Sequence, residues 1–310
     1  MAYAPIALFT YNRLEELEYT VQALQHNLLA AESDLTVYSD APKTEKEIEK
    51  VSRVRAFLKT LDGFKSITVV ERNENFGLAR SVIEGVSDIL RLHDKVIVLE
   101  DDLLTSKNFL TYMNKALDFY QHEERIFSIS GYTMPLKSLR EYKNDTYLAL
   151  RPASWGWATW KNQWENIDWE LQDYDTFIQD KKAIKRFNRG GIDLTRMLTN
   201  YKNKKNNSWA IRWSYAMFKA QKYAVYPKLS KVQNIGFSDD ATHCTNEHIY
   251  MTDLDSGEQF AFDFTSHIAL DKKITEDFKS VYEFHNKLLR KMKIKLSNYL
   301  STLQTFRSIP

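Results

Sequence analysis

The chain has 310 residues, of which 43% are hydrophobic and 27% charged, a composition typical of a folded globular protein rather than a disordered one. Its net charge is +2, yet residues 284–310 hold six Lys/Arg and no acid, which leaves −4 for the rest and disfavours binding to nucleic acid. A single cysteine, Cys244, excludes an intrachain disulfide and a multi-cysteine zinc site. Together with the lack of a secretory signal or a membrane-length apolar run, it predicts a cytoplasmic protein.

Strands and helices alternate in the first half of the chain. Short apolar runs predict strands at residues 5–10, 35–39, 66–71 and 95–99. Helices are predicted between them, at residues 14–28, 44–61 and 78–92. This alternation is typical of an α/β fold with a doubly wound sheet, whose ligands bind beyond the carboxyl ends of the strands. The residues that directly follow each strand are therefore the candidate functional residues.

The second half of the chain is less regular. A strand is predicted at residues 126–130 and helices at residues 181–201 and 208–221, and all seven tryptophans lie between Trp155 and Trp213. No repeat or linker divides the chain. We predict one continuous domain over residues 1–270, followed by a helical tail over residues 271–310.

Three consecutive acids, Glu100, Asp101 and Asp102, follow the predicted strand at residues 95–99. Adjacent carboxylates repel one another unless a cation is bound. Mg²⁺ and Mn²⁺ prefer oxygen ligands, and Mg²⁺ is commonly held by one or two carboxylates together with phosphate oxygens. The alternative is a solvated acidic turn that caps the next helix, expected near Ser106.

Polar residues also follow the other predicted strands: Thr10 to Arg13 follow the first, Ser39 and Asp40 the second, and Asn75 to Arg80 the third. Together with the acidic triplet, this set resembles the nucleotide-sugar half of GT-A-fold glycosyltransferases, and the triplet resembles the metal motif of that fold. The resemblance covers roughly residues 4–135 and implies a Rossmann-like mixed sheet flanked by helices. Residues 1–135 would form the nucleotide-sugar half and residues 136–270 the acceptor half.

The resemblance also implies roles for single residues. It places Asp102 on the metal, Asp101 as a support of the metal or on the ribose, and Glu100 near the donor sugar or ribose. Asp40 would accept a hydrogen bond from N3–H of a uracil base. Further donor contacts are implied for Thr10, Tyr11, Arg13 and Arg80. The two arginines are expected at the phosphates, with a surface or structural role as the alternative for each.

Residues 151–169, RPASWGWATWKNQWENIDW, resemble a segment of bacterial polysaccharide-type, family-2-like transferases and, more distantly, of N-acetylglucosaminyltransferase I-like enzymes. The resemblance implies that this segment lies beside the donor sugar and acceptor, with Trp155, Gly156 and Trp157 as the sugar platform. The alternative is a core role, which we expect for about three of the five tryptophans between Trp155 and Trp169.

An inverting transferase needs a carboxylate that takes the proton of the acceptor hydroxyl. The resemblance implies an aspartate just before the Ser208–Trp209 segment, but the chain has Asn207 there, and a neutral amide is no base. Three explanations stay open: another acid such as Asp239 or Asp240 serves, the mechanism is retaining, or the base has been lost. The nearby His243 is expected on the metal or diphosphate, with a structural hydrogen bond as the alternative.

The end of the chain carries a last signal. Five cations within residues 287–295 are interleaved with leucine, methionine and isoleucine. A basic amphipathic helix of this kind lies on an anionic membrane or packs against the domain or a second subunit. The two interpretations predict peripheral attachment to the inner face of the plasma membrane or a structural, oligomer-forming helix.

The sequence thus predicts a metal-dependent glycosyltransferase that uses Mn²⁺ or Mg²⁺. It would move a sugar from a nucleotide donor, a UDP-sugar before others, to a glycan or lipid-linked acceptor, with inversion favoured over retention. One alternative is a non-catalytic protein that binds carbohydrate or nucleotide, which Asn207 keeps open. The other is a nucleotidyltransferase, which usually opens with a glycine-rich phosphate loop, whereas residues 4–13 contain no glycine.

Overall fold

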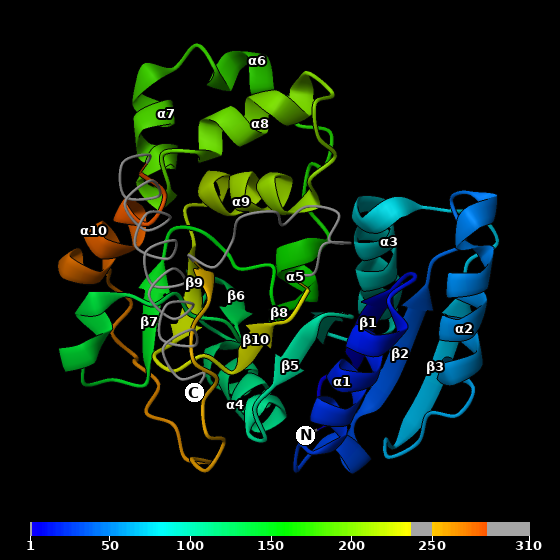
Figure 1. The fold of residues 1–310 in the computed structure, drawn as a ribbon. Coiled ribbons are helices and arrows are strands. Elements are labelled where there is room, and N and C mark those ends of the chain that lie inside the picture. The colour runs from blue at the N-terminus through cyan, green and yellow to red at the C-terminus, as the bar shows by residue number, and fades with distance from the viewer. Residues whose placement is uncertain (1, 237–249, 284–310) are drawn as a thin grey trace, which may run out of the picture.

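Four apolar runs of the first half form neighbouring parallel strands in the computed structural model, which describes residues 2–236 and 250–283 (Figure 1). The strands are β1 (Ile6–Thr10), β2 (Asp34–Ser39), β3 (Ser66–Glu71) and β4 (Lys95–Glu100). Every side chain of β1 is buried, because both faces of the sheet are covered by helices. The carboxyl ends of these strands meet at one edge of the sheet.

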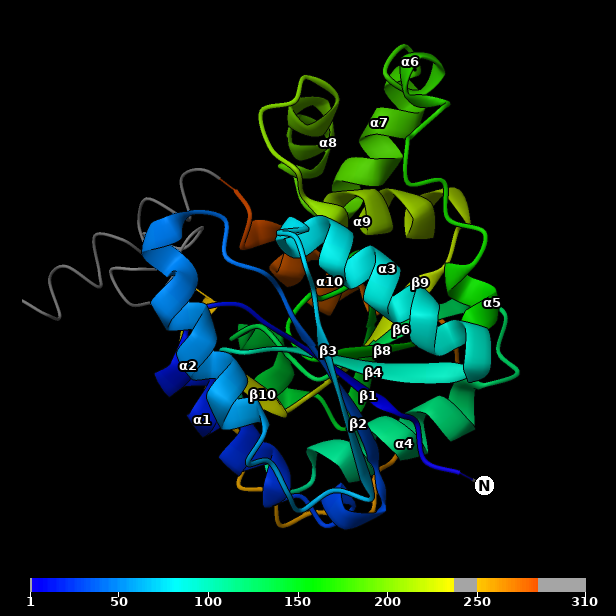
Figure 2. The ribbon, with the colours of Figure 1, turned by 90° about the vertical axis from the view of Figure 1, so that its right-hand side faces the viewer.

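The connecting helices cover the two faces of this parallel half. Helices α1 (Leu14–Gln25) and α2 (Ile48–Leu58) lie on one face and α3 (Gly77–Leu92) on the other, as the edge-on view shows (Figure 2). Each helix buries one apolar face against the strands, for example through Leu17 and Val21 of α1, which are 0% and 2% exposed. Short 3₁₀ turns complete the connections: η1 (Ala30–Glu32) and η2 (Glu45–Glu47).

The second half extends the same sheet with strands of both directions. The sheet has eight strands in the order β3-β2-β1-β4-β8-β6-β9-β7, in which β8 is antiparallel to β4 and β6, β9 is parallel to β6, and β7 is antiparallel to β9. The added strands are β6 (Ile126–Ser130), β7 (Thr146–Ala149), β8 (Trp157–Trp160) and β9 (Tyr223–Pro227). The predicted α/β fold, a Rossmann-like mixed sheet flanked by helices, is confirmed.

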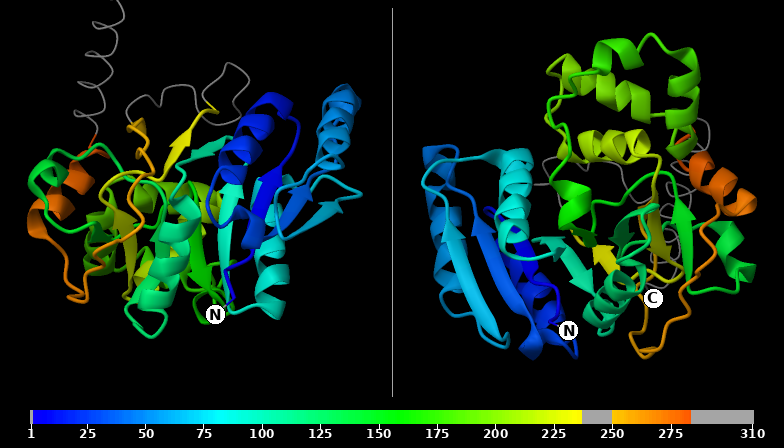
Figure 3. Two further views of the ribbon diagram at one scale, coloured as in Figure 1. Left: turned by 90° about the horizontal axis from the view of Figure 1, so that it is seen from below. Right: turned by 180° about the vertical axis from the view of Figure 1, so that it is seen from behind.

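A group of helices protrudes from the second half and has a small hydrophobic core of its own (Figures 1 and 3). It comprises α6 (Tyr174–Phe177), α7 (Lys181–Phe187), η4 (Asn188–Gly190), α8 (Leu194–Lys202) and α9 (Trp209–Lys219). The single helix predicted over residues 181–201 is wrong. The chain turns at Gly190 and Gly191, and Gly191 adopts φ +148°, a backbone conformation that L side chains rarely adopt.

The remaining elements tie the sheet to the C-terminal part of the chain. They are β5 (Leu103–Thr105), α4 (Phe109–Tyr120), η3 (Lys137–Glu141), α5 (Lys161–Trp164), β10 (Val232–Asn234) and α10 (Lys272–Ser280). Helix α10 packs against η3 and η4, and its Ile274 and Phe278 are buried. The amphipathic tail helix predicted after residue 283 lies outside the described residues. Within the described ranges, no helix is both long and apolar enough to span a bilayer.

Candidate functional site

The acidic triplet lies at the carboxyl edge of the sheet, where β4 ends at Glu100 and the chain turns into β5. Strand β5 pairs antiparallel with β10, which places Asn234 opposite Leu103. The N–H of Ile235 donates to the main-chain oxygen of Asp102 at 2.8 Å. This small second sheet therefore brings residues 234–236 to the acidic motif, although the two are far apart in sequence.

Asp101 joins the carboxyl end of β4 to that of β1. Its buried carboxylate accepts hydrogen bonds from Thr10 Oγ1 at 3.0 Å, from Tyr11 N at 3.1 Å and from Arg13 Nη2 at 2.9 Å. Behind it, Thr20 Oγ1 donates to the main-chain oxygen of Asp101 at 2.9 Å. Three predicted site residues are thus brought together with Asp101, and their contacts make Asp101 a fixed anchor of the site. Thr20 was missed by the sequence analysis, since it lies inside a helix.

The two carboxylate oxygens of Asp102 differ in their contacts with the described residues. Oδ2 accepts from Arg13 Nη2 at 3.0 Å, whereas Oδ1 makes no hydrogen bond within the described part of the chain. Gly236 lies directly against this carboxylate: an added Cβ would be 2.1 Å from Oδ2 of Asp102 and 2.7 Å from a nitrogen of Arg13. Only glycine allows the backbone to approach so closely without displacing these groups.

The site has more buried negative charge than Arg13 alone offsets. Burial, together with the charges of Asp102 and Asp101, raises the pKa of Glu100 to about 8. Burial also raises the pKa of Asp101 to about 6, although the Arg13 guanidinium acts in the opposite direction. Both shifts reflect a place where a further cation would stabilise the ionised carboxylates.

The donor set suits a hard divalent cation of the kind that a ligand's phosphates help to hold. Among the described residues, no three His, Cys, Asp or Glu side chains come together as metal ligands. Mg²⁺ requires fewer, because one or two carboxylates and substrate phosphates suffice. Oδ1 of Asp102, with Glu100 beside it, fits that requirement. His243, the other predicted ligand, lies outside the described residues.

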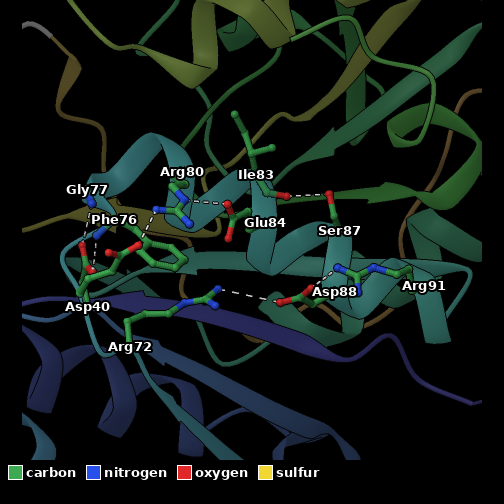
Figure 4. A network of polar contacts seen from close by, with 11 residues as sticks. Asp40, Arg72, Phe76, Gly77, Arg80, Ile83, Glu84, Ser87, Asp88 and Arg91 are labelled. Atoms are coloured by element: carbon green, nitrogen blue, oxygen red, sulfur yellow. Dashed lines mark hydrogen bonds and ion pairs between the residues drawn. The ribbon is translucent and has the colours of Figure 1, made fainter.

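Asp40 forms the second polar centre at this edge of the sheet. Its buried carboxylate accepts from the backbone N–H groups of Phe76 and Gly77, each at 2.8 Å, at the start of α3 (Figure 4). The neighbouring Asn75 Nδ2 donates to the main-chain oxygen of Ala41 at 2.7 Å. The ends of β2 and β3 are therefore locked together, and the contact of Asp40 with a base stays a prediction.

An arginine-rich cluster adjoins Asp40 at the first turn of α3. The exposed Arg80 guanidinium lies over the Phe76 ring at 3.6 Å and donates to Glu84 at 2.7 Å and to Glu74 at 3.0 Å (Figure 4). Arg72 contacts the same ring at 4.5 Å, and its Nη2 lies 3.9 Å from a carboxylate oxygen of Asp88, while neither Nε nor Nη2 makes a hydrogen bond to a described residue (Figure 4). Arg72 was missed by the sequence analysis, although it directly follows β3. Arg80 is engaged by carboxylates, and its contact with phosphate stays a prediction.

Trp157 cannot serve as a sugar platform, which corrects one prediction. It is 1% exposed and lies in the core against Trp164, Trp209 and Trp213, with the last ring at 4.2 Å. Trp160 and Trp164 are buried as well, so three of the five clustered tryptophans belong to the core, as expected.

The preceding Trp155 differs, because it is only half-buried and packs edge-on against Tyr132. Gly156 adopts φ +55°, and an added Cβ would lie 2.7 Å from Val232 of β10. This close approach positions Trp155 next to the strand that leads to Gly236. Of the predicted platform, Trp155 and Gly156 remain.

Among the described residues, the structure does not place a candidate general base at the acidic edge of the sheet. Asn207 is exposed and lies two positions before α9, whose first turn is capped by Ser208 Oγ accepting from Ile211 N at 3.3 Å. Asp239 and Asp240 lie outside the described residues. Both follow Gly236 closely in sequence.

Comparison with solved structures finds many chains of similar structure, 188 in all. No family model and no curated protein matches the chain. A mannosyltransferase, PcManGT from Pyrobaculum calidifontis in complex with GDP-Man and Mn²⁺, is similar in structure with a TM-score of 0.38 and 12% identity. The similarity covers 71% of this chain and 72% of that one. The donor and metal named there belong to that protein.

Proposed function

We propose that this chain is a metal-dependent glycosyltransferase of the GT-A type. It would transfer a sugar from a nucleotide donor to a glycan or lipid-linked acceptor. The first candidate for the donor is a UDP-sugar. The observation that carries the proposal is that Asp102, Arg13 and Gly236 contact one another at the carboxyl edge of a doubly wound sheet. Folds of this kind bind nucleotides at that edge.

The chemistry of the leaving group accounts for this arrangement. A nucleoside diphosphate leaves with about two to three negative charges, and a divalent cation supplies Lewis-acid stabilisation of them when bound. Asp102, with His243, would hold the cation, and Glu100 would face the donor sugar or ribose. Arg13 fixes the orientation of both aspartates through its Nη2 and can turn a further N–H toward a phosphate.

The other residues would position the donor and acceptor. Asp40 and the turn before α3 would receive the base, and Trp155 with Gly156 would offer an apolar surface to the sugar. The proton of the acceptor hydroxyl requires a base, for which Asp239 and Asp240 are the candidates because Asn207 is neutral. A sugar- or nucleotide-binding protein without catalysis is the second candidate function, and Asn207 favours it.

Turnover separates the two functions. The full chain is incubated with a panel of nucleotide sugars and mixed glycan acceptors, and free nucleoside diphosphate is measured with Mn²⁺ and with EDTA. If the protein is a transferase, it releases nucleoside diphosphate from one of these donors, and it does so only when metal is present. Asp102→Asn should abolish the release, whereas Asp175→Asn, on an exposed helix of the protruding group, should not. Metal-dependent donor binding without any release would identify the binding protein instead.

A further inference from the structure

The protruding helices carry a concentration of positive charge that the proposed transfer reaction does not use. We call residues 171–221, which contain α6 to α9, the helical lobe. It holds eleven Lys/Arg and four Asp, a net charge of +7. Because the chain totals +2 and residues 284–310 contribute +6, the rest of the chain carries −11. Positive charge is therefore segregated onto the lobe and the C-terminal residues.

Nine of the eleven cations of the lobe are exposed and make no ion pair among the described residues; the exceptions are Arg212, which is buried, and Lys219, which pairs with Asp173. Helix α7 shows the arrangement most clearly: Lys181, Lys182, Lys185 and Arg186 are all exposed, while Ala183 and Phe187 face the small core. None of these four cations makes an ion pair within the described part of the chain. The exposed cations continue beyond α7 at Arg189, Arg196, Lys202, Lys204 and Lys205.

The acids of the lobe do little to offset this charge at its surface. Asp193 is buried and pairs with Arg151, and Asp173 pairs with Lys219. Asp180 is used as the N-cap of α7, where it accepts from the N–H groups of Lys182 and Ala183. Asp175 alone remains as an exposed acid without such a contact among the described residues.

The end of the described chain lies against the same lobe. Tyr282 packs beside Gly191, where an added Cβ would meet its ring at 3.2 Å, and its ring lies over the Arg151 guanidinium at 4.1 Å. The last described residues, which precede the six cations of residues 284–310 in sequence, therefore lie next to the lobe.

We propose that the helical lobe docks this protein on an anionic membrane surface. The cations stand on exposed helix faces of a lobe that protrudes from the sheet, a shape that can meet an extended flat surface (Figure 2). Ile192, 43% exposed, is the one exposed large hydrophobic residue of the lobe. The contact is therefore electrostatic, without deep insertion, and it weakens as salt rises. An anionic polymer is the other ligand that such charge would attract.

Sedimentation of the full chain with vesicles tests the proposal without any nucleotide sugar, so its result is independent of the proposed transfer reaction. Vesicles of phosphatidylcholine are compared with vesicles that contain one third phosphatidylglycerol, at low and at high salt. The lobe variant K181Q/K185Q/R186Q is compared with the control K46Q/R53Q/K59Q, which removes the same residue types from exposed positions on and beside α2. Melting temperatures verify that both variants fold.

The wild-type protein and the control should sediment with anionic vesicles at low salt only. The lobe variant should bind about 100-fold more weakly, given the usual contribution of each cation near an anionic surface. Binding of the lobe variant equal to that of the control would overturn the proposal and assign any attachment to the C-terminal residues. An unchanged affinity for vesicles with a reduced affinity for an acidic polysaccharide would overturn it in favour of an anionic polymer.

Discussion

Because Gly236 has no side chain, its backbone can lie directly against the carboxylate of Asp102. Replacing it with alanine puts a methyl group 2.1 Å from Asp102 Oδ2, so the carboxylate and Arg13 must move. We expect Gly236→Ala to weaken Mn²⁺-dependent nucleotide binding at least tenfold. The melting temperature should change little, because the crowded atoms belong to side chains at the edge of the sheet. Calorimetry measures the affinity, and unchanged binding would mean that Asp102 does not hold the ligand in this orientation.

Asn207 stands at the position where the predicted inverting mechanism would need a carboxylate. If this position is a lost or weakened base, Asn207→Asp supplies a carboxylate for the acceptor proton, an effect typically worth 10²–10⁴-fold in rate. Since Asn207 is exposed and precedes α9, the substitution should leave the fold intact. The rate of sugar transfer to a matched acceptor is the measurement. A rate that stays the same or falls places the base elsewhere.

At the scale of elements, Asp40 connects β2 to the start of α3. Its carboxylate accepts three backbone hydrogen bonds, from Ala41, Phe76 and Gly77. In Asp40→Asn the amide nitrogen opposes at least one of these donors, and we expect a loss of about 1–3 kcal/mol in the free energy of unfolding. Urea unfolding measures it, with the exposed Asp94→Asn as control. Equal stability of the two variants would show that Asp40 is not needed as a cap.

A buried ion pair fastens the C-terminal segment to the sheet. Lys231 and Asp255 are 4% and 5% exposed at their side chains and pair with each other, and Asn108 Nδ2 donates to the same Asp255 oxygen at 2.8 Å. In Lys231→Met the buried Asp255 carboxylate loses its counter-charge. We expect the free energy of unfolding to fall by about 3–5 kcal/mol.

The double variant K231M/D255N removes both charges and should regain part of that stability. A double-mutant cycle from denaturant unfolding isolates the coupling between the two sites. Losses that simply add would show that the two side chains act independently.

The parallel half of the sheet could be predicted because each of its strands is a short segment rich in apolar and β-branched residues. Strand β3 begins and ends where the sequence predicts, and β4 extends by one residue to Glu100. The four-residue strands β7 and β8 could not be found, because so short a buried segment carries no periodic signal. The break after α7 was readable in principle from the Gly190–Gly191 pair, but the apolar spacing continues across it.

The candidate site, like the fold, could be predicted only in part from the sequence. The strand-end rule located Asp101, Asp102, Thr10 and Asp40, because parallel strands end at a common edge. The contact between Gly236 and Asp102 depends on the pairing of β5 with β10, which joins distant segments and leaves no local pattern. The core position of Trp157 likewise depends on three indole rings contributed by α5 and α9.

For the whole molecule, the central claim is that the acidic edge of the sheet binds a nucleoside diphosphate together with a divalent cation. Calorimetry of the full chain with UDP, GDP, CDP and ADP, each with Mn²⁺ and with EDTA, tests it most directly. We predict that one of these nucleotides binds, with UDP as the first candidate, and that it binds only with Mn²⁺. Asp102→Asn should remove the binding, whereas Asp175→Asn should keep it. Binding that is equally strong in EDTA, or no binding of any nucleoside diphosphate, would contradict the account.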